Sequence, residues 1–346
     1  MKHGSVLATA ALVRLGEATN RTLILPLVVF YPTSRCNSRC NSCDWWKHGG
    51  ERDLTLDEIA RVAAILPALG TQLVVFSGGE PLLRSDVFDA AALFRREGLA
   101  LHLLTSGVLL ERAADSVATF FSRVTISLDA TSEPLYEQVR GIAALKTVER
   151  GVARLRSAAP EIPITARATL HRANYHELSP LIDRAKALGF DGISFLAADV
   201  SSLAFGRMER PDATLLCLSR DDVARFEQDV EWTIVAHRAD FDSGFVAESP
   251  DKLRRLPKYY AAMLGDGDFP PVRCNAPWVS AVIEADGRVR PCFFHEPIGS
   301  IRDLPLETIV RRNLPLFRQS LTVGTNPICQ RCVCSLNAGW RNAPWA

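Results

Sequence analysis

Short apolar runs alternate with longer amphipathic segments between residues 27 and 196, and this alternation limits the folds open to the chain. The runs that have the length and composition of buried strands are residues 27–31, 73–76, 100–104, 124–128, 162–170 and 192–196. A strand that is followed each time by a helical crossover pairs in parallel with the next strand. The pattern therefore predicts an α/β fold built on a parallel sheet.

Three closely spaced cysteines follow the first predicted strand. Cys36, Cys40 and Cys43 have the spacing C-x3-C-x2-C. Cysteine thiolates are the usual ligands of iron–sulfur clusters, and three of them leave one iron of a four-iron cluster without a protein ligand. An open position of this kind is where a metal binds a substrate or cofactor. A zinc site completed by His48 is the alternative that the residues alone leave open.

A glycine pair follows the second predicted strand, in the stretch Ser77-Gly78-Gly79-Glu80-Pro81. Glycine lets the backbone approach a ligand closely. Together, the cysteine spacing and this stretch resemble the signature of the radical S-adenosylmethionine (SAM) superfamily. The resemblance implies a partial (β/α)6 barrel of the TIM type, a 4Fe-4S cluster on the three cysteines, and the amino group of SAM at Gly78, Gly79 and Glu80. We expect Glu80 to shape the loop and not to act directly in catalysis.

Polar residues follow or interrupt the later strands, at the end of the barrel where such folds place their sites. Ser106 follows the third predicted strand and Asp129 the fourth, and the resemblance implies contact with SAM or substrate for both. A turn serine and a helix-capping aspartate are the alternatives. Arg167 lies within the fifth strand and is expected to point inward, at a carboxylate of SAM or of the substrate. Arg140 resembles an arginine of relatives with extra clusters, the alternative being a solvated helix end.

The C-terminal part of the chain holds five further cysteines. Cys274 and Cys292 fit the pattern C-x12-G-x4-C, whose Asp-Gly turn predicts a β-hairpin. Cys329 and Cys332 form a C-x2-C pair, and four thiolates make a closed 4Fe-4S site. The layout resembles the twitch domain, the shortened relative of the SPASM domain, and implies an auxiliary cluster and thus two 4Fe-4S clusters in all. Cys334 is a possible substitute for Cys332, and a zinc ribbon is the alternative on spacing alone.

These features divide the chain into four parts. Residues 1–25 are expected to form an N-terminal helix and lead-in, and residues 26–200 the barrel. Residues 201–271 are expected to supply a loop and helices that link the two cluster-binding parts. Residues 272–346 correspond to the small twitch domain, a β-hairpin plus a helix.

The resemblance implies that the reduced cluster cleaves SAM to a 5'-deoxyadenosyl radical, which takes hydrogen from a substrate C–H bond. An auxiliary cluster with four cysteine ligands has no iron free for a substrate, so electron transfer and a net oxidation are favoured. We therefore expect a radical SAM oxidoreductase that dehydrogenates a small-molecule natural product or sugar-like intermediate. A one-electron reductant such as flavodoxin or ferredoxin is the expected partner.

Three other functions stay open. Cys217, in the loop after the sixth predicted strand, is a candidate hydrogen donor, which would make the protein a radical epimerase. A peptide maturase is the second alternative. It would need a separate recognition partner, because the 25 residues ahead of the first strand are too few for a recognition domain. A non-enzymatic iron–sulfur electron carrier is the third alternative.

The overall charge gives no sign of a polyanionic partner. Lys and Arg together number 40 and Asp and Glu 39, which leaves a net charge of +1. Nucleic acids and anionic membranes usually require a basic excess, and the apolar stretch at residues 6–13 is far short of a membrane span. Eight of the nine cysteines have cluster spacings and not those of a disulfide framework, which indicates a reducing compartment. We expect a cytoplasmic protein with no nucleic-acid or membrane partner.

Overall fold

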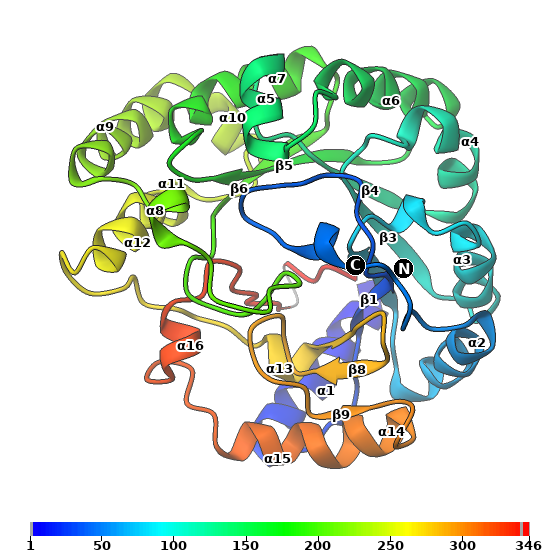
Figure 1. Ribbon diagram of the computed structural model, residues 1–346. Coiled ribbons are helices and arrows are strands. Elements are labelled where there is room, and N and C mark those ends of the chain that lie inside the picture. The colour runs from blue at the N-terminus through cyan, green and yellow to red at the C-terminus, as the bar shows by residue number, and fades with distance from the viewer. Residues whose placement is uncertain (1–2, 340–341, 346) are drawn as a thin grey trace.

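The structure is a computed structural model that describes residues 3–339 and 342–345 of the chain. Six parallel strands form a curved sheet with helices on its outside, as the alternation predicts (Figure 1). The strands are β1 (Leu27–Thr33), β2 (Leu73–Gly78), β3 (Ala100–Thr105), β4 (Arg123–Ser127), β5 (Ile164–Leu170) and β6 (Gly192–Ala197). The helices between them are α2 (Leu56–Ile65), α3 (Val87–Arg96), α4 (Leu110–Phe120), α5 (Glu133–Arg140), α6 (Leu145–Ala158) and α7 (Leu178–Ala187).

The barrel is preceded by one helix and followed by a mainly helical segment. The first helix is α1 (His3–Thr19), and those after β6 are α8 (Ala213–Leu216), α9 (Arg220–Ala236), α10 (Arg238–Asp242), α11 (Pro250–Leu253) and α12 (Arg255–Met263). The C-terminal part contains α13 (Ala276–Val279), β7 (Ser280–Ile283), β8 (Arg288–Arg290), β9 (Gly299–Ser300), α14 (Leu306–Thr308), α15 (Leu314–Gln319) and α16 (Pro327–Gln330). No helix in the described part of the chain is long and apolar enough to cross a membrane.

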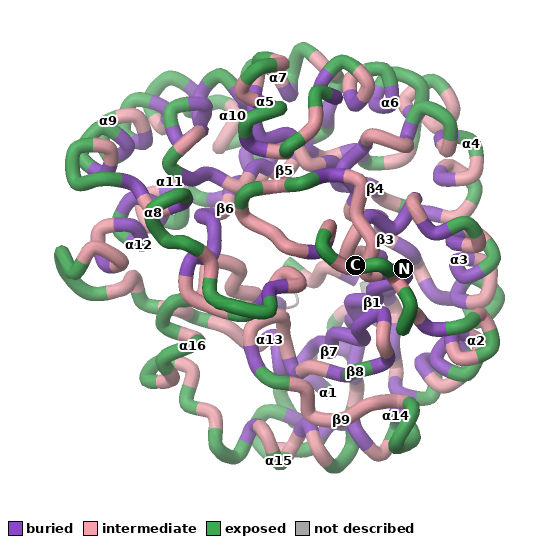
Figure 2. Tube along the Cα trace, viewed as in Figure 1, coloured by how far each residue is buried: buried purple, intermediate pink, exposed green. Residues whose placement is uncertain are grey.

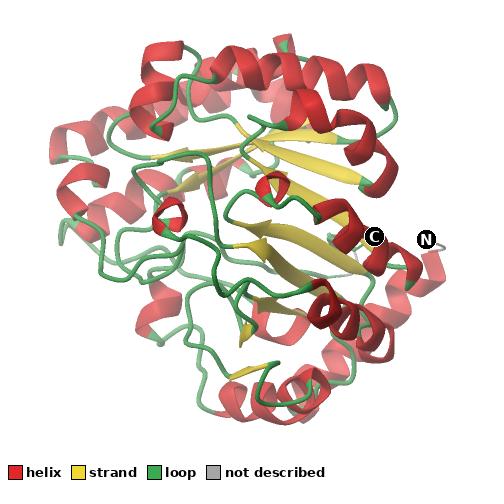
Figure 3. Ribbon diagram, turned by 45° about the vertical axis from the view of Figure 1, so that its right-hand side comes forward, coloured by secondary structure: helices red, strands yellow, loops and turns green. Residues whose placement is uncertain are grey.

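The C-terminal hairpin belongs to the same sheet as the barrel. The strand order is β6-β5-β4-β3-β2-β1-β7-β8-β9. Strand β7 pairs in parallel with β1, with Leu27 opposite Ser280, whereas β8 and β9 are antiparallel (Figure 3). The sequence predicts the hairpin, and the structure adds that it covers the edge of β1. Backbone groups at that edge are thereby paired, as buried N–H and C=O groups require.

The two faces of the barrel sheet differ in polarity. On the outer face Phe30, Phe76 and Phe94 are fully buried, and their ring centroids lie between 5.2 and 5.6 Å apart. Strand β5 shows the alternation most clearly, because Ala166 and Ala168 are buried while Arg167 between them is only partly buried (Figure 2). Successive side chains of a strand point to opposite faces. The polar residues of β5, Arg167 among them, therefore face the interior of the barrel.

An ion pair joins helix α2 to the loop that follows β9. The Nε atom of Arg302 donates to Oε1 of Glu58 over 2.7 Å. The same glutamate completes the capping box that the sequence predicts with Thr55 at the start of α2. The hydrogen bond from Arg302 is the main reason why the pKa of Glu58 falls from its usual 4.5 to about 2. The carboxylate thus fixes both a helix end and a contact between distant parts of the chain.

We predict that Arg302→Gln reduces the acid sensitivity of the folded protein. A carboxylate with a lowered pKa contributes stability that is complete above pH 4.5 and is lost as the pH falls toward about 2. The thermal midpoint of the wild type, measured at about pH 5 and about pH 3, should therefore fall more than that of the variant. Arg311→Gln is the control, because its partner Glu307 is half exposed. Equal falls in wild type and Arg302→Gln would contradict the prediction.

Candidate functional site

One cavity collects most of the residues that the sequence singles out. It lies at the carboxyl ends of the strands and has a volume of about 240 Å³. The predicted site residues that border it are Cys36, Cys40, Cys43, Gly78, Gly79, Glu80, Ser106, Arg167 and Cys334. Asp129 and Cys217 do not border it. The cavity therefore brings the cysteine loop after β1, the glycine loop after β2 and part of the C-terminal cysteine group to one place.

The cysteine loop, residues 34–44, rests on the C-terminal end of α5. The backbone amides of Arg39 and Asn41 donate to the carbonyl oxygens of Arg140 and Val139, over 2.8 and 3.1 Å. These are carbonyls that a helix end leaves without an intrahelical partner. Helix α5 was not among the segments predicted from the sequence, because it is short and only Tyr136 and Val139 of its eight residues are buried.

Burial makes the three thiols of this loop reluctant to ionise. It raises the pKa of Cys36 to about 11 and that of Cys43 to about 12, and it raises the pKa of Cys40 as well. In the described part of the chain no three metal-binding side chains converge on a site for a single ion. The thiols instead border a common space. Iron would have to displace their protons, as metals do when they bind cysteine.

His48 is engaged away from these thiols. Its Nε2 atom lies 2.7 Å from the carbonyl oxygen of Gly206, and its ring packs near Trp45 at 5.3 Å between centroids. The ring does not border the cavity. The structure therefore gives no support to the zinc site that the sequence left open with His48 as the fourth ligand.

The glycine loop is glycine-rich because it packs against the backbone of the cysteine loop. A Cβ atom on Gly79 would lie 2.0 Å from the carbonyl oxygen of Arg35. Gly78 has a φ of +99°, and a Cβ atom there would lie 2.7 Å from Cβ of Tyr31. Both positions are closed to other residues, by contact at Gly79 and by contact and backbone conformation at Gly78. The amide of Glu80 donates to the same Arg35 oxygen over 2.8 Å.

Glu80 ties the ends of β2 and β3 together, as the sequence leads us to expect. Its carboxylate is buried and accepts hydrogen bonds from the amide of Ser106, the hydroxyl of Thr105 and the amide of Leu82, over 2.7, 2.8 and 3.1 Å. Ser106 is thereby held at the cavity wall, where its hydroxyl lies 3.4 Å from Oδ1 of Asn37 in the cysteine loop.

Arg167 faces the cavity with most of its guanidinium group unpaired. Its Nε atom donates to Oγ of Ser194 over 3.1 Å, and no carboxylate of the described residues forms an ion pair with it. Its positive charge and that of Arg123 add to burial in lowering the pKa of His102 to about 3. The neighbouring imidazole is therefore neutral and leaves Arg167 as a positive charge. A negatively charged group on a ligand would complement this charge.

Asp129 differs from its predicted role. One carboxylate oxygen lies 3.0 Å from Nη1 of Arg140, and the other accepts from the amide of Thr169 over 2.7 Å. Both groups of the ion pair are nearly inaccessible, with side chains 4% and 12% exposed. Asp129 thus holds Arg140, which borders the cavity beside the cysteines, and is itself removed from it. The solvated helix-end alternative for Arg140 is wrong.

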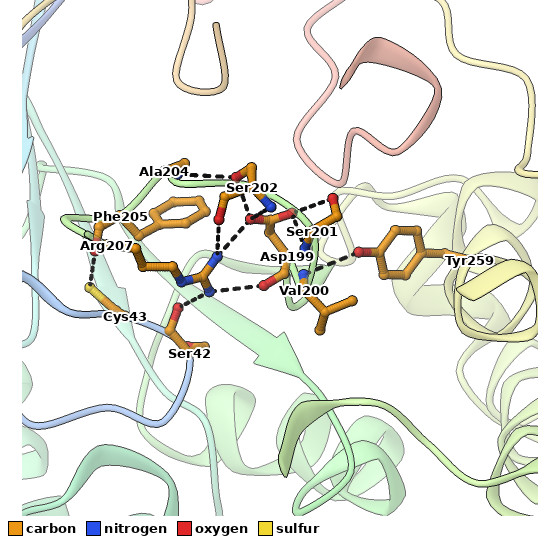
Figure 4. A network of polar contacts seen from close by, with 10 residues as sticks. All are labelled: Ser42, Cys43, Asp199, Val200, Ser201, Ser202, Ala204, Phe205, Arg207 and Tyr259. Carbon is orange, nitrogen blue, oxygen red and sulfur yellow. Dashed lines mark hydrogen bonds and ion pairs between the residues drawn. The ribbon is translucent and has the colours of Figure 1, made fainter. Parts of the chain in front are cut away.

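A loop after β6 closes over the cysteine loop through Asp199 and Arg207, two residues that sequence reasoning missed. Nη1 of Arg207 pairs with Asp199 over 2.7 Å, and Nη2 donates to the carbonyl of Ser42 over 2.7 Å (Figure 4). Phe205 has a φ of +62°, and its carbonyl accepts from the amide of Asp44 over 2.9 Å. The signal that could have revealed these contacts is Asp199 itself, a polar residue just after a strand, like Asp129.

The C-terminal cysteines form a second group, and one of them, Cys334, borders the same cavity. Burial raises the pKa of Cys292 to about 11 and that of Cys329 to about 12, and the charge of nearby Cys274 adds to both. The pKa of Cys332 is also raised, first by burial and then by the charge of Cys334. Cys334 borders the cavity, whereas Cys332 borders a smaller hollow beside β6. The five thiols are thus near enough to influence one another.

Aromatic rings form a row between the two cysteine groups. Trp45, two residues after Cys43, packs edge-on against Tyr31 at 5.5 Å between centroids. Tyr31 stacks on Phe293, the residue after Cys292, at 6.5 Å and 16°. All three rings border the cavity. The row gives the space between the two groups an apolar wall.

Cys217 lies outside the cavity, which removes the basis of its predicted role. It packs against the hydrophobic core as a partly buried residue, and burial raises its pKa. The tyrosines of α12 whose pKa its charge influences are Tyr259 and Tyr260. The reading as a small apolar side chain fits this place, and a hydrogen donor to a substrate in the cavity does not.

Comparison with known proteins agrees with these features. Residues 30–185 match the family model of the radical SAM superfamily, and residues 274–333 match that of an iron-sulfur cluster-binding domain named SPASM. The chain is 30% identical over 292 residues to a PqqA peptide cyclase of Rhodopseudomonas palustris, covering 82% of this chain and 71% of that protein. An AdoMet-dependent heme synthase of Methanosarcina barkeri is 29% identical over 168 residues, 47% of this chain and 48% of that protein. The crystal structure of Streptococcus suis SuiB bound to precursor peptide SuiA has a TM-score of 0.65 at 14% identity, with 93% of this chain and 74% of that one covered.

We predict that Arg167→Met weakens the binding of SAM or of a carboxylate-bearing substrate by about 1–3 kcal/mol, because a charge-assisted hydrogen bond is lost while most of the side-chain volume stays. Anaerobic calorimetry would measure both affinities. Arg96→Met, at an exposed position on α3, is the matched control. Unchanged affinity for both ligands would show that Arg167 binds neither.

Proposed function

The chain belongs to the radical SAM superfamily and carries a C-terminal SPASM-type iron–sulfur domain, and from this premise we propose that it carries out a radical-based oxidation of a peptide. SAM and 4Fe-4S clusters are its cofactors, as the sequence predicts. The relative from Rhodopseudomonas palustris is named for a peptide, and SuiB was crystallised with one. These names favour a peptide over the small molecule that we expected from the sequence.

The observation that carries the proposal is a single cavity that members of both cysteine groups border. Cys36, Cys40 and Cys43 of the first group border it, and so do Cys334 of the second group and Phe293, the residue after Cys292. A substrate in this space would lie between a cluster that is open to a cofactor and a cluster able to exchange electrons. This arrangement suits a reaction in which hydrogen leaves on one side and an electron on the other.

We assign the first cluster to Cys36, Cys40 and Cys43, and the surroundings of SAM to the loops beside it. The backbone of Gly78 and Gly79, shaped by Glu80, borders the cavity next to these thiols. Ser106 and Arg167 border it as well, and Arg167 offers an unpaired cation to a carboxylate. When bound to the reduced cluster, SAM supplies the radical that removes hydrogen from an unactivated C–H bond. Asp129 acts through Arg140, which it holds at the cavity wall.

The auxiliary cluster is assigned to Cys274, Cys292 and Cys329, with Cys332 or Cys334 as the fourth ligand. Four thiolates leave no iron for a substrate, which favours electron transfer over substrate ligation. A net oxidation follows, such as dehydrogenation or cross-linking of the peptide. Epimerisation is less well supported, because Cys217 lies outside the cavity. A protein that only carries electrons would not need a glycine loop and an unpaired Arg167 beside its cluster, so this alternative is less well supported.

The remaining residues exclude water and hold the site closed. Tyr31, Trp45, Phe205 and Phe293 give the cavity apolar walls where a radical would otherwise meet solvent. The buried pair of Arg207 and Asp199, with side chains 2% and 1% exposed, holds the loop that carries Phe205. Exclusion of competing reactions is the part of radical chemistry that the protein supplies.

The test uses the reconstituted enzyme with synthetic peptides encoded by the short reading frames that neighbour its gene. We expect 5'-deoxyadenosine and a peptide lighter by two hydrogens, both measured by mass spectrometry. The double variant Cys274→Ala and Cys292→Ala should lose one of two clusters, from about eight irons to about four, and still form 5'-deoxyadenosine without the lighter peptide. An oxidised sugar-like compound with untouched peptides would contradict the proposal, and so would bound zinc in place of the second cluster.

A further inference from the structure

A tryptophan flanked by two cations lies beside the cysteine loop and outside the cavity. The guanidinium carbon of Arg39 lies 5.9 Å from the ring centre of Trp46, and Nζ of Lys47 lies 5.3 Å from the same centre. Such distances are those of cation–π contacts. Arg39 is exposed, and the side chain of Lys47 is 51% exposed. None of the three residues borders the cavity.

The indole ring is joined directly to one of the cysteines. The Nε1 atom of Trp46 donates to the carbonyl oxygen of Cys43 over 3.0 Å. Arg39 is the neighbour of Cys40 in the chain. The ring and its two cations therefore form a platform that is connected to two of the three cysteines and lies outside the cavity. In Figure 1 the blue segment that contains them crosses the open end of the barrel, between β1 and α2.

The charge of the platform is positive but partly compensated. Lys47 pairs with Asp44 over 3.0 Å, whereas Arg39 has no ion pair among the described residues. Of the exposed side chains that follow, Glu51 is acidic and Arg52 is basic, and these two cancel. The local excess thus comes from Arg39, held in place on an aromatic ring. Lys47 adds to the excess when its pair with Asp44 opens toward a stronger anion.

We propose that Trp46, Arg39 and Lys47 form the docking surface for an acidic one-electron carrier protein of the flavodoxin or ferredoxin type. The inference rests on the proposed assignment of a cluster to Cys36, Cys40 and Cys43. The cluster must gain one electron before it can act on SAM, so a reduced carrier gives up one electron, the cluster takes it up, and no proton or bond changes hands. Complementary charge steers such encounters and raises their rate. The hydrogen bond from Trp46 to Cys43 gives the electron a short covalent and hydrogen-bonded route from the surface to a ligand.

The experiment measures how fast a reduced flavodoxin bleaches the cluster in a stopped-flow instrument, with SAM and substrate left out. The double variant Arg39→Glu and Lys47→Glu should slow this step at least about tenfold at about 0.01 M ionic strength, and the difference should shrink at about 1 M, where charge is screened. Arg96→Glu on α3 is the control and should leave the rate unchanged. The pair Arg39→Gln and Lys47→Gln should fall between the double variant and the wild type.

Two further measurements distinguish a loss of carrier docking from a loss or alteration of the cluster itself. Iron content and reduction by photoreduced 5-deazariboflavin, a small uncharged reductant, should be the same in all variants. If that reduction slows as much as the flavodoxin step, the substitutions act on the cluster and the docking proposal is wrong. An unchanged flavodoxin rate, or a change only in the affinity for a peptide substrate, would also overturn it. A protein with no cluster on the three cysteines would instead refute the proposed function.

Discussion

Backbone hydrogen bonds hold the cysteine loop against three neighbouring segments of the chain. The geometry of the rest of the site depends on these bonds. The glycine loop donates to it through the amide of Glu80, which bonds to Arg35, while the amide of Gly79 bonds to Thr33 at the end of β1. Helix α5 accepts from it, and the loop after β6 accepts from the amide of Asp44. Each such bond contributes about 0.5–1.5 kcal/mol, and a buried amide left without a partner costs more. Because backbone groups make these contacts, the thiols are positioned by the path of the chain and not by their own side chains.

Charge in the cavity is arranged so that one cation stays available. Arg140 is held by Asp129, and Arg207 by Asp199, in pairs that are almost inaccessible to solvent. A buried pair of this kind contributes less to stability than to the fixing of a geometry, since desolvation offsets the attraction. Arg167 has only a serine hydroxyl as its partner among the described residues. An anionic group of SAM or of the substrate would complete its environment and be oriented by it.

Much of the fold could be predicted from the sequence, because its signals are local. Apolar runs predict the six barrel strands, and the capping box of Thr55 and Glu58 predicts the start of α2. The cysteine and glycine motifs lie in two loops that border the same cavity. Two features of the fold were not predicted. Helix α5 is short and buries only two of its eight residues. The pairing of β7 with β1 joins residues about 250 positions apart, which no local pattern encodes.

The site shows the same limit at the level of single residues. Arg167 was predicted to face inward from its place in a strand, and it does. Asp129 was predicted to contact a ligand because it also follows a strand. Its two carboxylate oxygens instead bind Arg140 and the amide of Thr169. Position along a strand predicts direction, whereas the partner that a side chain meets depends on elements elsewhere in the chain.

The central claim is that two clusters share one cavity and that only one of them is open to SAM. Electron paramagnetic resonance of the reduced, reconstituted protein tests it most directly. We expect two overlapping cluster signals, and the addition of SAM should shift only the signal that is absent when Cys36, Cys40 and Cys43 are replaced by Ala. A shift in the signal that depends on Cys274 and Cys292, or no shift in either, would contradict the account.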